Sequence, residues 1–272
     1  MKKIQVLVAT VGQKDDSIAE KMNLRCDVIV ANQADRNEVT ERTAENGTIR
    51  MITTQTRGVG LNRNIALLAA DAEILLFADD DMTYRDNAVQ GVYESFQRNP
   101  AADMMIFGVD IRKDGQILER RRNKPGRVPL WQTMKYGTYA LAVRADALRR
   151  ANISFHLLFG GGTVYGSGED TLFIRECFRK GLRVYRSDHV LGERCKDSST
   201  WFRGYDEKFF FDKGALYACA FPWMKYFVAM YFSWRFAKKT DLPVWKIYRT
   251  MCSGFRAFVL GKSYDDWKRR NG

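Results

Sequence analysis

Few of the residues that mark a secreted or zinc-binding scaffold occur in this chain. It has five cysteines and two histidines in 272 residues, and the cysteines are scattered without any CxxC spacing. This pattern excludes a zinc cluster or a disulfide framework as the organising feature and favours a reducing compartment. The chain also starts without an apolar signal segment. We therefore expect a cytoplasmic protein.

Long apolar runs are missing as well. The most aromatic stretch, 221–236, is interrupted by Lys225 and Arg235 and is too short to cross a bilayer. Acidic residues are the scarcer charge, with 32 Asp and Glu against 44 Lys and Arg. The resulting net charge of +12 predicts an anionic partner, which is a phosphorylated ligand, an anionic lipid surface or nucleic acid. Nucleic acid is disfavoured, because the sequence contains no recognisable nucleic-acid-binding module.

An apolar stretch at 74–78 runs directly into Asp79, Asp80 and Asp81. Such a stretch is typical of a buried parallel strand, whose carboxyl end lies where open α/β sheets bind ligands. Because side chains alternate along a strand, we expect Asp79 and Asp81 on one side, roughly 7 Å apart at the backbone. This geometry suits a divalent cation and the diphosphate that it carries, and a cation or a cationic ligand would relieve the mutual repulsion of the carboxylates. The alternative is a solvated acidic turn.

Strand and helix patterns alternate through the first part of the chain. The alternation predicts parallel strands with right-handed crossovers, and so an α/β, Rossmann-like mixed sheet flanked by helices. The predicted strands are 4–8, 27–30, 48–52, 74–78, 104–111, 139–143 and 183–185, and the predicted helices lie at 17–23, from 61, around 89–96, at 145–150 and after 170. Residues 112–127 are expected to form an exposed hairpin or loop.

Glycines are concentrated at 160–168, just before Glu169 and Asp170. Such glycine density marks backbone that must pass close to another group. The run from Ser167 to Asp170 also fits a helix capping box, which is the structural alternative for these acidic residues.

Three motifs resemble, in order and placement, those of the family 2 type of inverting GT-A glycosyltransferase, over about residues 1–215. They are Gly58-x-x-Leu61-x-Arg63-Asn64, Leu76-Phe77-Ala78-Asp79-Asp80-Asp81 and Gly168-Glu169-Asp170-x-x-Phe173. The resemblance implies the GT-A fold and transfer of a sugar from a nucleotide diphosphate donor, with UDP as the expected nucleotide, to a glycan or lipid-linked acceptor. It also implies a role in bacterial surface-polysaccharide synthesis. The alternative enzyme is a metal-dependent nucleotidyltransferase, which shares the sheet and the acidic site but attacks phosphorus.

The resemblance also implies roles for the acidic residues. Asp170 would be the general base that takes the proton from the acceptor hydroxyl, supported by Glu169. The triplet would be the DXD element, with Asp81 as the ligand of Mn²⁺ or Mg²⁺ and its two neighbours, Asp79 and Asp80, on the donor. His189 would be a second metal ligand, with a hydrogen-bonded structural histidine as the alternative.

The donor nucleotide is expected near the ends of the first two strands. The resemblance places base and ribose contacts at Thr10, Asn32 and Gln33, with Arg63 and Asn64 lining the same pocket. An acidic residue is usual at the end of the second strand in that family, so this chain predicts recognition of the base by amides and leaves the nucleobase open. Arg63 has an alternative role as an electrostatic cap on the sheet edge.

The sequence predicts a catalytic domain at 1–215, with a nucleotide-binding half at 1–110 and an acceptor half at 111–215. Trp201 is expected near the acceptor sugar, on a loop that closes over the donor, with core packing as the alternative for its aromatic neighbours. Residues 216–272 are rich in aromatic and basic side chains. They predict a helical extension that lies on the anionic inner face of the plasma membrane or, alternatively, packs on the protein.

Overall fold

A mixed sheet of eleven strands forms the centre of the chain. A computed structural model describes residues 3–196 and 204–271. The strands are β1 (Ile4–Val11), β2 (Asp27–Gln33), β3 (Glu38–Ala44), β4 (Gly47–Thr54), β5 (Ile74–Asp79), β6 (Met82–Tyr84), β7 (Met104–Lys113), β8 (Gln116–Arg121), β9 (Gly126–Arg127), β10 (Leu141–Arg144) and β11 (Val184–Cys195). Their order is β3-β4-β2-β1-β5-β10-β7-β11-β6, with β8 paired to β7 and β9 to β11.

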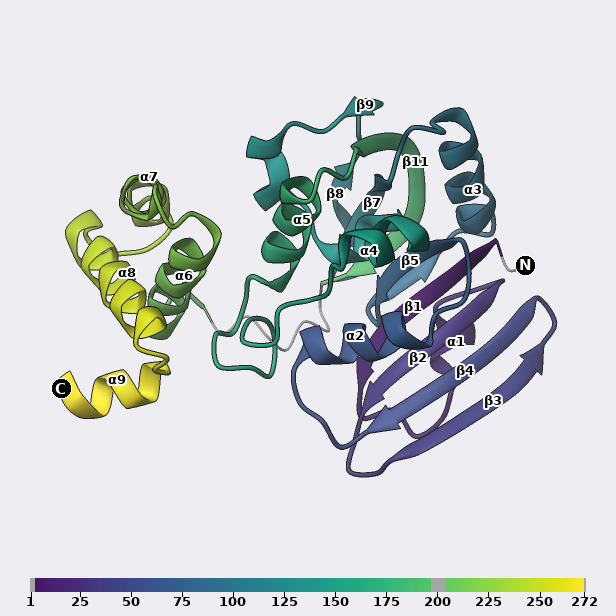
Figure 1. Cartoon of the computed structure of the whole chain (residues 1–272), viewed down its shortest axis with the longest axis horizontal. Helices are drawn as coiled ribbons and strands as arrows, with labels where there is room; N and C mark the ends of the chain where they lie inside the picture. The colour runs from purple at the N-terminus through teal and green to yellow at the C-terminus, as the bar shows by residue number, and fades with distance from the viewer. Residues whose placement is uncertain (1–2, 197–203, 272) are drawn as a thin grey trace.

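Helices cover both faces of the sheet and form a separate group at the C-terminal end (Figure 1). The α-helices are α1 (Ile18–Lys21), α2 (Val59–Ala69), α3 (Ala88–Arg98), α4 (Ala145–Ala151), α5 (Glu169–Arg179), α6 (Glu207–Ala220), α7 (Lys225–Ala237), α8 (Val244–Val259) and α9 (Tyr264–Asn271). Two 3₁₀ helices, η1 (Leu130–Lys135) and η2 (Thr138–Ala140), precede β10. The predicted alternation of strands and helices is confirmed.

β5 is the buried parallel strand that its apolar sequence predicts. It pairs parallel to β1, which pairs parallel to β2. Leu75 and Phe77 face the core beneath α2 and α5, whereas Leu76 faces the core beneath α1 and α3. Burial on both faces explains why the strand is continuously apolar rather than alternating. β5 thus carries its acidic end to the edge where the parallel strands finish.

The sequence patterns missed the hairpin of β3 and β4. β3 is antiparallel to β4 at the edge of the sheet, and its residues are exposed or half-buried. It therefore lacks the apolar alternation by which a strand is recognised, and its charged side chains suit an unpaired edge. The expected hairpin at 112–127 is present as the end of β7 paired with β8.

The helices α6 to α9 have a core of their own. They contact the sheet-containing part of the chain through the glycine-rich segment, because Gly166 N donates to Asp212 Oδ2 at 2.9 Å and the Tyr165 hydroxyl donates to the Lys262 carbonyl at 3.1 Å. The predicted boundary at residue 215 falls within α6. Within the described ranges, no helix is both long and apolar enough to cross a bilayer.

Candidate active site

Arg63, on α2, joins the acidic end of β5 to the start of α5. Its guanidinium donates to Asp79 Oδ1 at 2.7 Å, to Asp170 Oδ1 at 3.1 Å and to Glu169 Oε1 at 3.3 Å. The Arg63 side chain is only 5% exposed. Burial opposes its charge, but Asp79, Asp170 and Glu169 outweigh that effect and raise the pKa of Arg63. The buried cation therefore fixes three carboxylates, from two distant segments, around one point.

A second arginine, Arg194 on β11, holds the other end of the triplet. Its Nε donates to Asp81 Oδ1 and Oδ2 at 3.0 and 2.9 Å, and its Nη2 lies 3.7 Å from Asp79 Oδ2. The guanidinium also stacks 4.5 Å from the ring centroid of Tyr139. Contact of one guanidinium with Asp79 and Asp81 brings the two side chains to the same side, as expected, but β5 ends at Asp79 and Asp81 lies in the turn that follows. The sequence reasoning did not identify Arg194.

Asp80 points to the neighbouring strand. Thr10, at the end of β1, donates its hydroxyl to Asp80 Oδ2 at 2.6 Å, and Gln13 Nε2 donates to the Thr10 hydroxyl at 3.2 Å. Burial raises the pKa of Asp80, and the hydrogen bond from Thr10 opposes the rise. Burial also raises the pKa of Asp81, against the hydrogen bond from Arg194. Each member of the triplet thus has a side-chain hydrogen-bond partner, although Asp80 is exposed and lies with Asp81 in the turn that follows β5.

Glu169 and Asp170 begin α5, and Gly168 caps the helix with φ of 124° and without a side-chain cap hydrogen bond. Ser167 therefore does not form the capping box, although Glu169 Oε2 accepts a hydrogen bond from Gly168 N at 3.1 Å. A Cβ on Gly168 would lie 2.6 Å from Leu216 Cδ1, so only glycine allows this turn against α6. The Asp170 side chain is 31% exposed and that of Glu169 13%. Burial raises the pKa of Glu169 to about 7, with repulsion from Asp170 adding to the rise and Arg63 opposing it.

The two hydrogen bonds that hold Asp170 use the same oxygen. Thr138, in η2, donates its hydroxyl to Asp170 Oδ1, which also accepts from Arg63. Among the described residues, none donates a hydrogen bond to Asp170 Oδ2. One carboxylate oxygen is therefore anchored while the other can accept a proton from a bound hydroxyl group.

Lys213, on α6, brings the helical extension to the same site. Its Nζ donates to the Ser167 hydroxyl at 3.2 Å. Burial lowers the pKa of Lys213, and the charges of Glu169, Asp212 and Asp170 oppose that change. No sequence motif pointed to this lysine, since its hydrogen-bond partner Ser167 lies 46 residues earlier in the chain.

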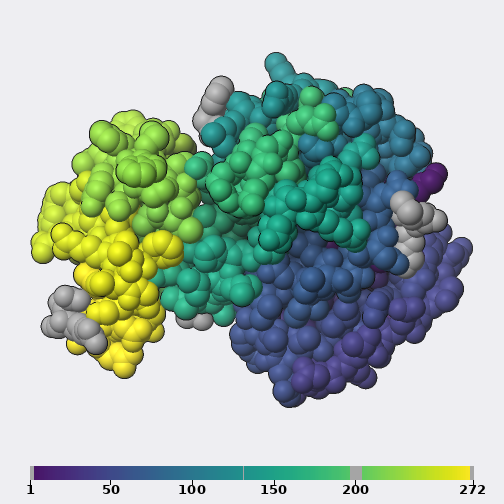
Figure 2. All heavy atoms as spheres, in the orientation of Figure 1, coloured from purple at the N-terminus to yellow at the C-terminus, as the bar shows by residue number. Residues whose placement is uncertain are grey.

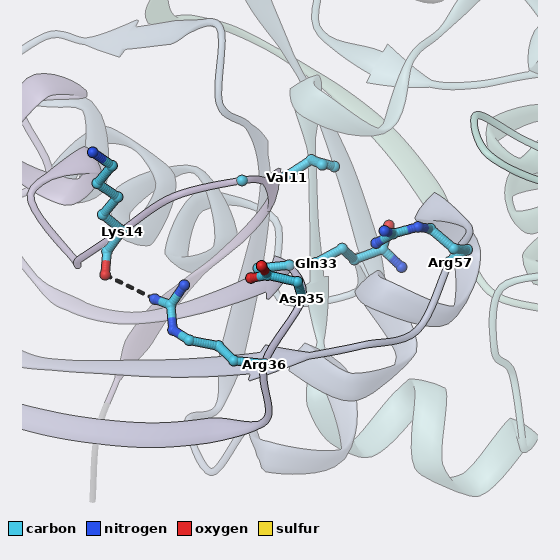
Figure 3. Close-up of a pocket in the computed structure, with 8 residues that line it drawn as sticks. Val11, Lys14, Gln33, Asp35, Arg36 and Arg57 are labelled. Atoms are coloured by element: carbon cyan, nitrogen blue, oxygen red, sulfur yellow. Dashed lines mark hydrogen bonds between the residues drawn. The ribbon is translucent and has the colours of Figure 1, made fainter.

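A cavity of about 500 Å³ opens beside the ends of β1 and β2 (Figure 3). Its lining residues are Val11, Gly12, Lys14, Gln33, Ala34, Asp35, Arg36 and Arg57. Of the predicted nucleotide contacts, only Gln33 lines this cavity. Asp35 lies two residues after the end of β2. It supplies a carboxylate close to the strand end, where the family usually has an acidic residue and this chain has amides. Three of the lining side chains, Lys14, Arg36 and Arg57, are basic, which favours an anionic ligand.

The side-chain amides of Asn32 and Asn64 form hydrogen bonds with backbone groups of the protein. Asn32 is fully buried, and it accepts from Gln13 N and donates to the Gln13 carbonyl, both at 3.0 Å. Asn64 exchanges two hydrogen bonds with the Phe155 backbone at 2.8 and 2.9 Å. A further amide, Asn62, donates to the carbonyls of Thr10 and Ala31 at 3.1 and 2.8 Å. These amides fix the walls of the site, whereas the sequence analysis placed Asn32 and Asn64 in the nucleotide pocket.

His189 does not join the acidic triplet. Its ring packs on α3 so closely that a Cβ on Gly91 would lie 2.1 Å from His189 Cε1, and it meets the Phe107 ring edge-on. Burial lowers the pKa of His189, and its buried Nε2 has no hydrogen-bond partner among the described residues. Arg194, five residues later on β11, occupies the position beside Asp81. Trp201 lies outside the described residues.

Asp79 and Asp81 are the carboxylates of the site that could hold a divalent cation together with a phosphorylated ligand. No group of three or more His, Cys, Asp or Glu side chains within residues 3–196 and 204–271 is arranged to hold a metal ion. Mg²⁺ commonly binds through one or two carboxylates, with substrate phosphates and water completing the shell. Asp81, with Asp79 beside it, offers such a pair, provided that the cation replaces Arg194 on Asp81.

Solved structures with the same arrangement of elements are known. S. aureus TarS 1-349 in complex with UDP-GlcNAc matches with a TM-score of 0.63 over 96% of this chain and 93% of that chain, at 15% identity. The same protein alone and with UDP matches with TM-scores of 0.60 and 0.58 over the same shares, at 14% identity. A search of curated proteins found no sequence relative. The structural likeness identifies the GT-A fold.

The sequence itself identifies the family. The family model described as "Glycosyl transferase family 2" matches residues 10–156, which include the acidic triplet and Arg63. More than half of the chain is matched, and the chain belongs to this family of glycosyltransferases. The family resemblance is thus confirmed; the first two motifs lie within the matched residues, and the third, at 168–173, lies outside them.

Proposed function

We propose that the protein transfers a sugar, with inversion, from a UDP-linked donor to a hydroxyl group of a glycan or lipid-linked acceptor. The observation that carries the proposal is the cluster built by Arg63, which brings the acidic end of β5 within hydrogen-bond contact of the same guanidinium as Asp170. A donor-binding edge and a proton acceptor thus share one site. The structures of S. aureus TarS with UDP-GlcNAc and with UDP support a uridine nucleotide as the donor group.

The donor nucleotide would occupy the cavity at the ends of β1 and β2. Its basic lining fits an anionic ligand, and Gln33 and Asp35 offer polar groups to a base or ribose. The diphosphate would extend toward Asp79 and Asp81. There five carboxylates, Asp79, Asp80, Asp81, Glu169 and Asp170, outnumber the three nearby cations, Arg63, Arg194 and Lys213, so an incoming diphosphate adds negative charge to a negative site.

A divalent cation, Mn²⁺ or Mg²⁺, is therefore proposed as a cofactor. When bound it would neutralise charge on the leaving diphosphate. Asp81 and Asp79 are the residues that would hold it, and the position of His189 against α3 does not favour that residue as a ligand.

Asp170 is proposed as the general base. As the acceptor oxygen attacks the anomeric carbon, its proton passes to Asp170 Oδ2 and the bond from that carbon to the diphosphate breaks. Attack from the face opposite the leaving group inverts the anomeric configuration. Arg63 and Thr138 hold Oδ1, and the buried Glu169 shares Arg63 with Asp170, so these neighbours orient the base rather than react.

The test is product analysis with a panel of nucleotide sugars and glycan acceptors. Glycosyl transfer releases nucleoside diphosphate, whereas the rival nucleotidyl transfer releases pyrophosphate. Asp170→Asn should keep donor binding in a thermal-shift assay and lose transfer by about 10²-fold or more. Asp146→Asn, an exposed carboxylate on α4, is the matched control and should retain transfer. Substantial turnover by Asp170→Asn would remove Asp170 from this role.

The acceptor class and a place in bacterial surface-polysaccharide synthesis remain part of the proposal. They rest on the family, and a screen of lipid-linked and free oligosaccharides would test them.

A further inference from the structure

One face of α7 and of the turn before it is aromatic and exposed. Its residues follow each other at helical spacing, and they are Trp223, Phe227, Met230, Tyr231 and Trp234. Trp223 is 94% exposed, Phe227 77% and Trp234 54%. We call this set the α7 aromatic face. Large apolar side chains gathered in this way on one surface mark an interaction site rather than scattered surface residues.

The α7 aromatic face is not needed to hold α7 in place. The opposite side of the helix carries the buried residues Ala229 and Ser233, and Val228, Phe232 and Phe236 pack against the core of the helical extension. In the space-filling view, the extension forms one end of the molecule, away from the strands (Figure 2). The helix is thus anchored by one side, while its aromatic side remains open to a partner.

The charged side chains on α7 and on the residues that follow it up to Lys239 are all basic. The sequence contains no Asp or Glu between Asp212 and Asp241, whereas Lys225, Arg235, Lys238 and Lys239 fall within that stretch. Lys238 Nζ lies 3.6 Å from the Trp234 ring centroid, and the Arg235 guanidinium 5.7 Å from that of Tyr231. The charged groups of Lys238 and Arg235 therefore lie directly beside the aromatic rings. A partner that complements this surface must be apolar at its centre and anionic at its rim.

We propose that the α7 aromatic face docks the enzyme on an anionic lipid surface, with the rings at the level of the headgroups and the basic side chains on the lipid phosphates. Trp and Tyr are the side chains that settle at a membrane interface, and Lys and Arg reach outward from it to anionic headgroups. The occupant is thus a bilayer surface rather than a protein. The proposal stands apart from the proposed donor, acceptor and base.

Vesicle sedimentation of the full-length protein tests the proposal. Wild type should sediment with vesicles of equal parts phosphatidylcholine and phosphatidylglycerol, and Trp emission should shift to the blue. The triple variant Trp223→Gln, Phe227→Gln, Trp234→Gln should lose at least about tenfold in partition coefficient, because binding scales with inserted apolar area. Leu68→Gln and Val39→Gln remove exposed apolar side chains elsewhere and should bind as wild type does.

The contribution of the basic side chains to vesicle binding is tested separately. Lys238→Gln and Lys239→Gln should each weaken binding to the anionic vesicles by about fivefold and leave binding to phosphatidylcholine vesicles unchanged. Circular dichroism verifies that each variant is folded.

Three results would overturn the proposal. They are no sedimentation of the wild type, equal binding by the triple variant, and a self-association that the triple variant abolishes in sedimentation velocity without any vesicle binding by the wild type. The last result would assign the α7 aromatic face to a second copy of the chain.

Discussion

Replacing Arg63 by methionine tests the electrostatic centre of the site. The guanidinium contacts three carboxylates at 2.7 to 3.3 Å and is 5% exposed. Methionine keeps much of the apolar stem but leaves Asp79, Glu169 and Asp170 without their shared cation. Because breaking a buried pair leaves uncompensated charge, we expect the free energy of unfolding to fall by about 3–5 kcal/mol.

The pH dependence of that loss gives a second readout. Arg63 opposes the rise that burial causes in the pKa of Glu169, so its removal lets the folded-state pKa of Glu169 rise further, and the variant takes up protons on folding as the pH falls. The loss should therefore be largest near pH 8 and smaller near pH 5. Urea denaturation, followed by circular dichroism at both pH values, measures it.

Arg42→Met is the matched control for this experiment. Arg42 also contacts two carboxylates, Asp16 at 2.7 Å and Glu20 at 2.8 Å, but its side chain is 40% exposed. Solvent screens such pairs, so this variant should lose little stability. An equally small loss for Arg63→Met would refute the reasoning, because it would mean that the carboxylate cluster is solvated and does not depend on a buried cation.

Two further predictions concern the carboxylates themselves. The pKa of Glu169 is raised from 4.5 to about 7 by burial, so its contribution to stability is complete below pH 4.5 and is lost as the pH rises through 7. In the variant Glu169→Gln, the free energy of unfolding should therefore change with pH by up to about 3 kcal/mol less between pH 4.5 and 7 than in wild type. Parallel curves of unfolding free energy against pH for the two proteins would contradict this. Donor binding measured by calorimetry should strengthen on adding Mn²⁺, and Asp81→Ala should remove that gain, while Asp86→Ala, an exposed carboxylate, should keep it. Equal wild-type affinity with and without the ion would count against a metal cofactor.

Much of the sheet could be predicted, because burial on both faces leaves a local signature. The continuous apolar run of β5 predicts a central parallel strand, and the pairing of β5 with β1 confirms it. The edge strand β3 left no such signature, since its side chains are exposed or half-buried. Only its register with β4 identifies it.

The candidate site was partly predictable for the same reason. The expectation that Asp79 and Asp81 share one side agrees with their contacts with the Arg194 guanidinium, although Asp81 lies in the turn after β5 and not in the strand. The roles expected for Asn32, Asn64 and His189 came from their positions in the chain, and position alone does not tell whether a side chain faces a cavity or a backbone partner. In the fold, both amides are bonded to backbone.

The sequence by itself determined the family, the strand that carries the acidic triplet, and the helix start that carries Glu169 and Asp170. Only the tertiary structure decided which cations hold these carboxylates. Arg63 and Asp170 are 107 residues apart, and Arg194 and Asp81 are 113 apart. Such pairs form because the order of strands in the sheet brings distant segments to one edge, and no local pattern encodes that order.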